Sequence, residues 1–365
     1  MANIINIPGK TIFYGSYSVL LKGHVSLVFA VVDEHGKGVE VKWEEKEERI
    51  ISKQFNLDLI PSINDKQLVN YAYLTAKTYL NMFNKWKPIT LTLTNSPLFG
   101  NPGEKSGLGS SAAATVGIIK ALFLANDLDP ELHVETIFKL SQLSYGWYSG
   151  KIGSAFDIAV SSIGTTIEYY RYNPDMLNLP KENNLESLRE AIKNSIFKPW
   201  DWVRINRVKP NVDLLLFNIK YKSTSSISAV KAWKTWKKER TEEFEQLMNE
   251  QDKYERAAIA ALKENNFIKV RTYTRKAREV HRRMQKSISE IVPSFEYVEP
   301  DELKELIDNV EENVDGVIAG RCPGAGGYDA VAFLVKKQNN KIVKQILDLG
   351  KDIDLNISYL PSKII

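Results

Sequence analysis

A glycine-rich run, Pro102–Ala114, constrains this sequence more than any other segment. A regular helical pattern, 112–125, follows it directly. Gly107 and Gly109 would let the backbone approach a ligand closely, and the free N–H groups at a helix start favour an anion. The run is therefore interpreted as a phosphate-binding loop. The simpler alternative is a tight loop in which a serine caps the helix.

Two known phosphate-binding patterns do not explain this run. Walker A, G-x-x-x-x-G-K-[ST], needs a lysine that follows neither glycine, and the similar tail Gly9–Thr11 lacks the first glycine. The dinucleotide pattern G-x-G-x-x-[GA] fits residues 107–112, but it needs a strand before it and an acidic residue after the next strand. Here a Pro/Gly loop precedes, and Asp127 follows the helix with no strand between.

Hydrophobic periodicity predicts a mixture of helices and strands along the 365 residues. The expected helices are 65–83, 112–125, 130–148, 241–264, 266–291, 303–310 and 340–349. The expected strands are 3–15 with a break at Pro8–Gly9, 25–32, 39–41, 89–94, 164–170, 212–219, 316–320, 330–335 and 353–360. Residues 43–64 are polar and aperiodic. The length suits two domains, and 173–210 is the expected boundary.

Composition argues against several classes of function. A formal charge of +4 on 365 residues gives no general attraction to nucleic acid or anionic membranes. The single cysteine, Cys322, excludes an internal disulfide, and neither a secretory signal nor an apolar run of about 20 residues is found. We expect a cytoplasmic monomer or homodimer that binds a small molecule, with no nucleic-acid or membrane partner.

Two sets of conspicuous side chains are expected to be structural. The basic segment 271–286 is interpreted as the solvated face of a long helix, since Glu279 interrupts its positive charges. The tryptophans are interpreted as packing anchors; they are Trp200, Trp202, Trp233 and Trp236.

Three glycine-bearing loops, at 8–10, 102–112 and 323–327, are interpreted as walls of one ligand cleft. Lys10 brings a positive charge to the first loop, and Asp157 begins a helix after another glycine loop. A single lysine is more often a solvated surface residue, and an aspartate at a helix start is more often a cap. Their place beside glycine loops makes both candidates for function.

Together, the loops resemble the three motifs of the GHMP kinases, a family of small-molecule kinases. The first motif, Pro-x-Lys leading to a glycine-rich segment, is matched by Pro8–Lys10 and Gly15–Leu20. The second, the nucleotide phosphate loop, is matched by Gly107–Ala112, and the third by Gly324–Asp329.

Within this family the sequence most resembles the kinases that act on phosphomevalonate. Those enzymes favour a tyrosine in the first motif, where Tyr17 stands, and carry a segment similar to Lys151–Asp157. Mevalonate kinases usually have Gly-Glu-His in the first motif, and Ser16 and Tyr17 depart from that pattern.

The resemblance implies a two-domain α/β (α+β) fold, with an N-terminal half like domain 2 of ribosomal protein S5 and a ferredoxin-like C-terminal half. Residues 1–172 would form the ATP-binding domain, 173–210 a connecting excursion, and 211–365 the domain that completes the acceptor site in the cleft between them. The implied site residues are Lys10 and Asp157 for catalysis; Gly107, Leu108, Gly109, Ser110 and Ser111 for ATP; Ser111 also for Mg²⁺; and Tyr17, Lys105, Lys151, Gly324 and Ala325 for the acceptor. The loop at Asn95 is the candidate for contacting the adenine.

The implied reaction is ATP- and Mg²⁺-dependent phosphoryl transfer to 5-phosphomevalonate, giving 5-diphosphomevalonate for isoprenoid synthesis. A phosphate monoester has a second pKa of about 6, so its oxygen is largely ionised at neutral pH. The harder task is to bring two polyanions together. Lys10 and Lys105 are therefore expected to contribute more to the rate acceleration than Asp157. The alternatives are a GHMP kinase with an alcohol acceptor, such as mevalonate kinase, and a non-catalytic sensor of the same fold.

Overall fold

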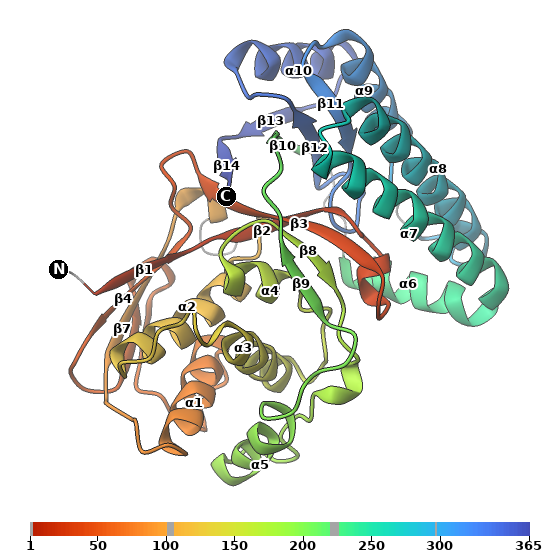
Figure 1. Cartoon of the computed structure of the whole chain (residues 1–365). Coiled ribbons are helices and arrows are strands. Elements are labelled where there is room, and N and C mark those ends of the chain that lie inside the picture. Colours follow the sequence, from red (N-terminus) through yellow and green to blue (C-terminus); the bar gives the residue numbers. More distant parts are fainter. Residues whose placement is uncertain (1–2, 101–105, 220–225, 296–297) are drawn as a thin grey trace. The chain divides into compact units, whose positions relative to one another are not determined.

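The structure is a computed structural model that describes residues 3–100, 106–219, 226–295 and 298–365 (Figure 1). The chain divides into two compact units. Unit 1 contains residues 1–11, 29–207 and 365, and unit 2 contains residues 12–28 and 208–364. Strands β2 (Gly9–Tyr14) and β3 (Val25–Asp33) therefore each have residues in both units.

Unit 1 combines helices with a five-stranded sheet of order β1-β4-β7-β5-β6. The sheet is antiparallel except between β5 and β7, which run parallel. Strands β8 and β9 pair antiparallel as part of another sheet. The strands are β1 (Ile4–Ile7), β4 (Val39–Glu44), β5 (Arg49–Ser52), β6 (Leu57–Leu59), β7 (Thr90–Asn95), β8 (Ile167–Tyr170) and β9 (Arg204–Arg207). The helices are α1 (Leu68–Asn81), α2 (Ser110–Ala125), α3 (Val134–Ser149), α4 (Phe156–Ile163) and α5 (Leu185–Ser195).

Helix α2 is the central helix of unit 1, and its neighbours fix where its first residue lies. It packs against α1, α3 and α4 as well as against strands β1 and β4. Gly117 makes the approach to the sheet possible, because a Cβ there would lie 2.7 Å from the Val41 side chain and 3.2 Å from that of Ile7. Most of α2 is apolar and buried, so tertiary packing rather than capping stabilises it.

Unit 2 contains a four-stranded antiparallel sheet of order β11-β12-β10-β13. Its strands are β10 (Asp213–Ile219), β11 (Val317–Arg321), β12 (Ala330–Val335) and β13 (Ile357–Leu360), followed by β14 (Ser362–Ile364). Its helices are α6 (Ser226–Glu239), α7 (Thr241–Lys263), α8 (Phe267–Ile291), α9 (Asp301–Asn313) and α10 (Asn340–Asp352). Alternate residues of β10, among them Leu215 and Phe217, pack with Leu306 and Ile307 of α9 in one core.

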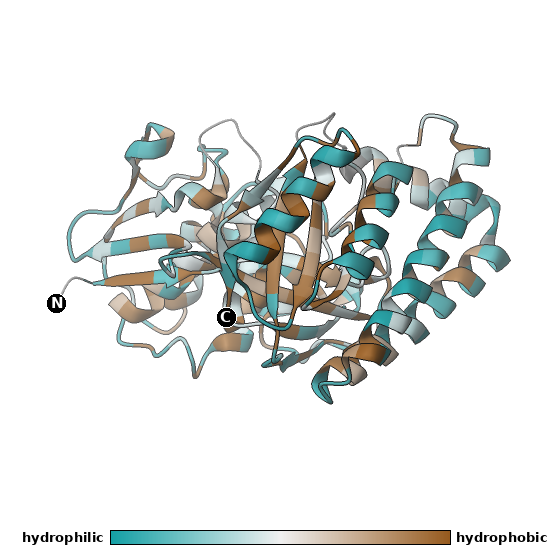
Figure 2. Ribbon diagram, turned by 90° about the horizontal axis from the view of Figure 1, so that it is seen from above, coloured by the Kyte–Doolittle hydropathy of each residue, from teal (hydrophilic) through white to brown (hydrophobic). Residues whose placement is uncertain are grey.

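A second core of unit 2 lies among helices α6, α7 and α8. Trp233, Trp236 and Phe244 are buried there with Met284, and Tyr17 joins them from the first glycine-rich segment. Figure 2 shows hydrophobic and hydrophilic residues recurring along these helices, as expected of helices that bury one face. None of the helices in the described part of the chain has the length and apolar character that a membrane crossing requires.

Most of the expected elements are present, and a few differ from the expected ranges or burial. No element was predicted in the polar and aperiodic residues 43–64, yet they contain β5 and β6, which are short strands that bury Ile50 and Leu59. Helix α3 begins at Val134, one turn after the expected start at Pro130. Trp202, expected to be a packing anchor, is 57% exposed, whereas the other three tryptophans of that set are buried. Residues up to 207 of the expected connecting excursion are grouped with unit 1 and contain α5 and β9.

Candidate functional site

The second glycine motif forms a left-handed turn that leads directly into helix α2. Gly107 and Gly109 have φ values of +72° and +80°, which side-chain-bearing residues rarely adopt. Gly109 is the N-cap of α2, and its carbonyl accepts the N–H of Ala113. The alternative in which a serine caps this helix is wrong, because α2 has no side-chain cap bond and Ser110 is already its first helical residue. No side-chain cap therefore uses the first backbone N–H groups of α2.

Lys10 is bound to this turn through both its backbone and its side chain. Its backbone N–H donates to the Leu108 carbonyl at 2.7 Å, and its Nζ donates to the Gly107 carbonyl at 2.7 Å. The same ammonium lies 5.4 Å from the centre of the Phe156 ring. A Cβ at Gly109 would be 3.0 Å from the Lys10 side chain, so the glycine leaves room for it. A positive charge is therefore held beside the start of α2.

Asp157 lies in the first turn of α4. Side chains of strand β8 and of the residues after it bind the loop that precedes this helix. Ala155 precedes the helix with φ +63°. The Ser154 carbonyl accepts the Tyr169 hydroxyl at 2.6 Å, and the Gly153 carbonyl accepts the guanidinium of Arg171 at 3.3 Å. These contacts fix the backbone from which the Asp157 carboxylate projects.

Lys10 and Asp157 are electrostatically coupled. Burial lowers the pKa of the Lys10 ammonium, because the surrounding protein removes part of its hydration. The negative charge of Asp157 opposes that shift and raises the pKa of Lys10. The carboxylate thus helps to keep the lysine charged.

The site suits a polyphosphate better than a metal ion on its own. A helix N-terminus with an adjacent lysine provides N–H donors and positive charge for an anion. Within the described ranges, no group of three or more His, Cys, Asp or Glu side chains is arranged to hold a metal. Mg²⁺ usually takes one or two protein oxygens and the remainder from substrate phosphates and water. The exposed Ser111 hydroxyl offers an oxygen suited to that mode.

The other candidates for ATP binding have different surroundings. Leu108 is buried, and its N–H donates to the Ser106 hydroxyl at 3.3 Å, so this residue builds the loop. Asn95 ends β7, where its N–H donates to the Gln54 side chain at 2.8 Å. No described contact links Asn95 to the glycine turn.

The candidates for acceptor binding are divided between the units. Lys151 is exposed on the loop after α3 in unit 1, and Lys105 lies outside the described residues. In unit 2, the hydroxyl of the buried Tyr17 donates to the Ala325 carbonyl at 2.8 Å. Gly324 has φ +67°, and its N–H donates to the Ile12 carbonyl at 3.4 Å. The first and third glycine motifs are thus joined within unit 2.

Sequence reasoning missed two aromatic residues around the glycine turn. Phe156 precedes Asp157 and lies close to the Lys10 ammonium. Phe99 is buried beside Gly9, where it helps to hold the lysine-bearing strand. Neither residue belongs to a spacing pattern, so only their proximity to the motifs could have indicated them.

Gly9→Ala should destabilise unit 1. A Cβ at Gly9 would lie 2.3 Å from the Leu108 carbonyl oxygen and 2.1 Å from Cε1 of Phe99, so backbone must move. We expect the free energy of unfolding in urea to fall by about 1–3 kcal/mol. Gly36→Ala is the control, because it introduces left-handed strain in open space. If the two variants lost the same free energy, close packing at Gly9 would not be the cause.

Part of the chain, including the second glycine motif, is similar to a known protein family. Residues 70–165 match the family model of the GHMP kinases N terminal domain. A phosphomevalonate kinase of Aspergillus fumigatus is 27% identical over 261 residues, which are 66% of this chain and 52% of that protein. The chain spans about half the length of the curated relatives that it matches.

Two solved structures share the fold over nearly the whole chain. A Lin0012 protein from Listeria innocua has a TM-score of 0.78 at 21% identity, covering 99% of both chains. The phosphomevalonate kinase of Streptococcus pneumoniae, in complex with phosphomevalonate and AMPPNP, has a TM-score of 0.73 at 19% identity, again over 99% of both chains. These likenesses confirm the expected two-domain α/β fold.

Proposed function

We propose that the chain is a kinase of the GHMP family and, within that family, an ATP-dependent phosphomevalonate kinase. The observation that carries the proposal is the turn before α2, to which the Lys10 ammonium is bound at 2.7 Å. The curated relatives named phosphomevalonate kinase, and the Streptococcus structure with phosphomevalonate and AMPPNP, support this choice of donor and acceptor. A cytoplasmic location is part of the proposal and fits the single, buried Cys322.

In the proposed mechanism the N-terminus of α2 binds the triphosphate of ATP. The N–H groups at Ser110 and Ser111 donate to phosphate oxygens, and Lys10 neutralises charge that the transferring group carries. Mg²⁺, when bound, would add further positive charge, with Ser111 and the substrate phosphates as its ligands. The chain's own contribution is to position the donor and to balance its charge.

Phosphoryl transfer to a phosphate acceptor needs little help from a general base. An ionised oxygen of the phosphomonoester attacks the γ-phosphorus, a new P–O bond forms, and the bond to the β,γ-bridging oxygen breaks to release ADP. No proton has to be removed from the dominant ionic form of the acceptor. We infer that Asp157 acts chiefly by supporting the charge of Lys10. Tyr17, Lys105, Lys151, Gly324 and Ala325 stay proposals for acceptor binding, and Asn95 for the adenine.

The pH profile should report on Lys10. Because burial lowers its pKa below the ordinary 10.5, activity should be lost as the pH rises through that lowered value, at a lower pH than for an ordinary lysine. Asp157→Asn removes the charge that raises this pKa, so the alkaline limb of kcat/KM for ATP should move to still lower pH. Asp127→Asn is the control, since Asp127 pairs with Lys87 on the surface. An alkaline limb that Asp157→Asn leaves in place would contradict the coupling.

The acceptor can be identified by measuring ATP consumption with phosphomevalonate, mevalonate, galactose and homoserine. We expect turnover with phosphomevalonate, and a much lower kcat/KM with each of the three alcohols. Turnover of mevalonate but not of its phosphate would replace the proposal by the alcohol-kinase alternative. Absence of turnover with all four, together with binding of phosphomevalonate, would favour the sensor alternative.

A further inference from the structure

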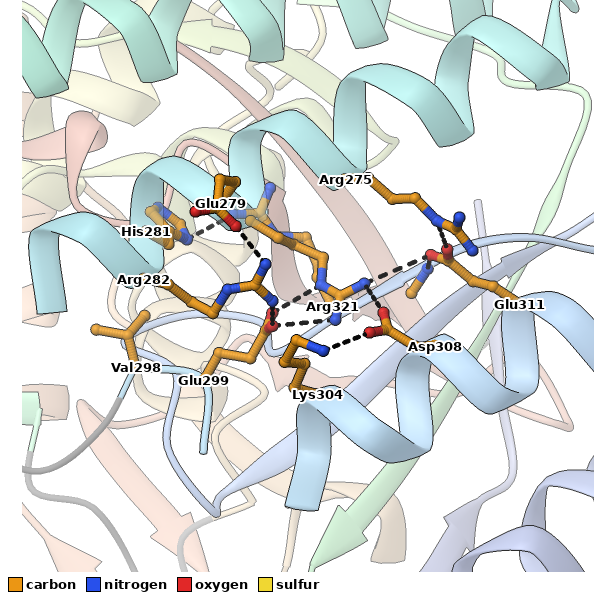
Figure 3. A network of polar contacts seen from close by, with 12 residues as sticks. Arg275, Glu279, His281, Arg282, Val298, Glu299, Lys304, Asp308, Glu311 and Arg321 are labelled. Carbon is orange, nitrogen blue, oxygen red and sulfur yellow. Dashed lines mark hydrogen bonds and ion pairs between the residues drawn. The ribbon is translucent and has the colours of Figure 1, made fainter. Parts of the chain in front are cut away.

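A buried charged cluster lies in unit 2, three residues before the third glycine motif begins. Arg321 ends β11 and is 1% exposed. Its Nη1 donates to Oε1 of Glu255 at 3.0 Å. Its Nη2 lies 3.2 Å from Nδ1 of His281, and both of these residues are labelled in Figure 3. The guanidinium also lies 5.9 Å and 5.4 Å from the ring centres of Phe13 and Tyr14. One side chain therefore contacts α7, α8 and the strand that leads into the first motif.

The protonation of this cluster follows from its donors. A guanidinium can only donate hydrogen bonds, so Nδ1 of His281 must accept and the imidazole proton must be on Nε2. Burial and the positive charge of Arg321 hold the pKa of His281 well below its ordinary value, which agrees with a neutral ring. His281 therefore adds no charge, and Glu255 is the carboxylate that faces Arg321 directly.

Glu255 connects the cluster to the first glycine motif. It is fully buried on α7, and it accepts a hydrogen bond from the backbone N–H of Gly15. Its Oε2 also lies 3.4 Å from the hydroxyl of Ser18, which donates to it. A carboxylate that binds two residues of one tight segment fixes the position of that segment.

The same segment is joined to the third glycine loop at two further points. The Tyr17 hydroxyl donates to the Ala325 carbonyl, and the Gly324 N–H donates to the Ile12 carbonyl. Arg321 is three residues before Gly324, so movement of the guanidinium would be transmitted along the backbone to this loop. The segment 12–18 and the loop 321–325 thus behave as one connected body within unit 2.

We propose that the Arg321–Glu255 pair is a positioning pair that sets the geometry of these two segments and, through them, the affinity for the acceptor. A buried charged pair tolerates little displacement, because any separation leaves charge without a partner in a low-dielectric interior. A substrate misplaced by about 1 Å can cost about 100-fold in rate, so a binding loop benefits from such a restraint. The proposal rests on the proposed function, since it assigns acceptor binding to Tyr17, Gly324 and Ala325.

The test separates positioning from stability by removing both charges together. Arg321→Met and Glu255→Gln each leave one charged or polar partner unpaired, so both should lower the urea midpoint. The double variant Arg321→Met/Glu255→Met leaves no charge unpaired and should recover part of that midpoint, although Gly15 and Ser18 lose their acceptor and His281 its donor. We expect the KM for phosphomevalonate in the double variant to stay raised by about tenfold or more, with the KM for ATP within about twofold of wild type.

The matched control is Arg283→Gln/Glu250→Gln, which removes a 2.6 Å ion pair on helices α7 and α8 that touches neither loop. It should leave both KM values unchanged. A double variant with wild-type midpoint and wild-type acceptor KM would overturn the proposal. If the double variant does not fold, Glu255→Gln decides: a raised acceptor KM with an unchanged ATP KM supports positioning, and an unchanged acceptor KM overturns it.

A failure of the proposed function is recognised separately. If wild type does not turn over phosphomevalonate, the acceptor assignment fails, and amide hydrogen exchange of Gly324 and Ala325 then tests the pair without any acceptor. Faster exchange at these amides in Glu255→Gln, with no change in the control, supports the restraint. Equal exchange in both variants overturns it.

Discussion

Lys10→Met should lower kcat by about 100- to 1000-fold, the loss usual when one preorganised charge is removed from a transition state. The ammonium is fixed by the Gly107 carbonyl at 2.7 Å, and the neighbouring Leu108 carbonyl holds the lysine backbone. Methionine keeps the length and the apolar contact with Phe156 but supplies no charge. Steady-state kinetics with saturating ATP and acceptor would measure the effect.

The ranking against Asp157 makes this prediction specific to the mechanism. Asp157→Asn should cost less than Lys10→Met, because an ionised acceptor needs no general base and the carboxylate acts through the lysine. Lys87→Met is the matched control, since that lysine forms a surface ion pair with Asp127 in the same unit. A larger loss of kcat from Asp157→Asn would contradict the charge-balance mechanism.

Arg278→Met should lower the free energy of unfolding by about 3–5 kcal/mol, the usual cost of breaking a buried ion pair. Arg278 is 2% exposed, and it bonds both oxygens of Glu299 at 2.7 and 3.0 Å and Asp308 at 2.8 Å. Figure 3 shows these carboxylates with Glu311, which is also buried. Methionine would leave Glu299 with Arg282 as its remaining cationic partner. Urea unfolding followed by circular dichroism would measure the loss.

Arg283→Met serves as the control on the same helix. Its partner is Glu250, and both side chains are substantially solvated, so its loss should cost no more than about 1 kcal/mol. If Arg278→Met cost as little as Arg283→Met, the Arg278 network would contribute nothing beyond a surface pair.

This network overturns one expectation from the sequence. The basic segment 271–286 was expected to be a solvated face, but Arg278 is buried and Arg271 donates to the carbonyls of Val317 and Ile318. The partners of Arg278 lie 21 and 30 residues farther along the chain. Local charge patterning cannot reveal such partners, because it records only neighbours on the same helix.

Elements with strong local signals could be predicted from the sequence. The long helices α7 and α8, the helix after the glycine motif and the alternating strand β7 all lie within a few residues of their expected ranges. Strands β5 and β6 were missed because each is only three or four residues long and takes its stability from pairing in the sheet. The left-handed Gly109 is the N-cap of α2, so the loop geometry rather than a serine hydroxyl begins this helix.

The candidate site was predictable only in part. Glycine spacing indicated the left-handed turn before α2, and the resemblance indicated Lys10, which lies 97 residues before Gly107. Nothing in the sequence indicated that Asp157 supports the charge of Lys10, or that Arg321, Glu255 and His281 meet in one buried cluster. Each of these is an ordinary polar residue in its own segment, and only the tertiary fold brings it to its partner.

The central claim is that the acceptor oxygen belongs to a phosphate group. Phosphorus-31 NMR of a reaction containing ATP, Mg²⁺ and phosphomevalonate tests it most directly, because a monoester and a diphosphate give distinct signals. We predict that the phosphomonoester resonance disappears while two coupled diphosphate resonances of the new product grow in step with those of ADP. A phosphomonoester resonance that persists while ATP is converted to ADP and inorganic phosphate would contradict the claim.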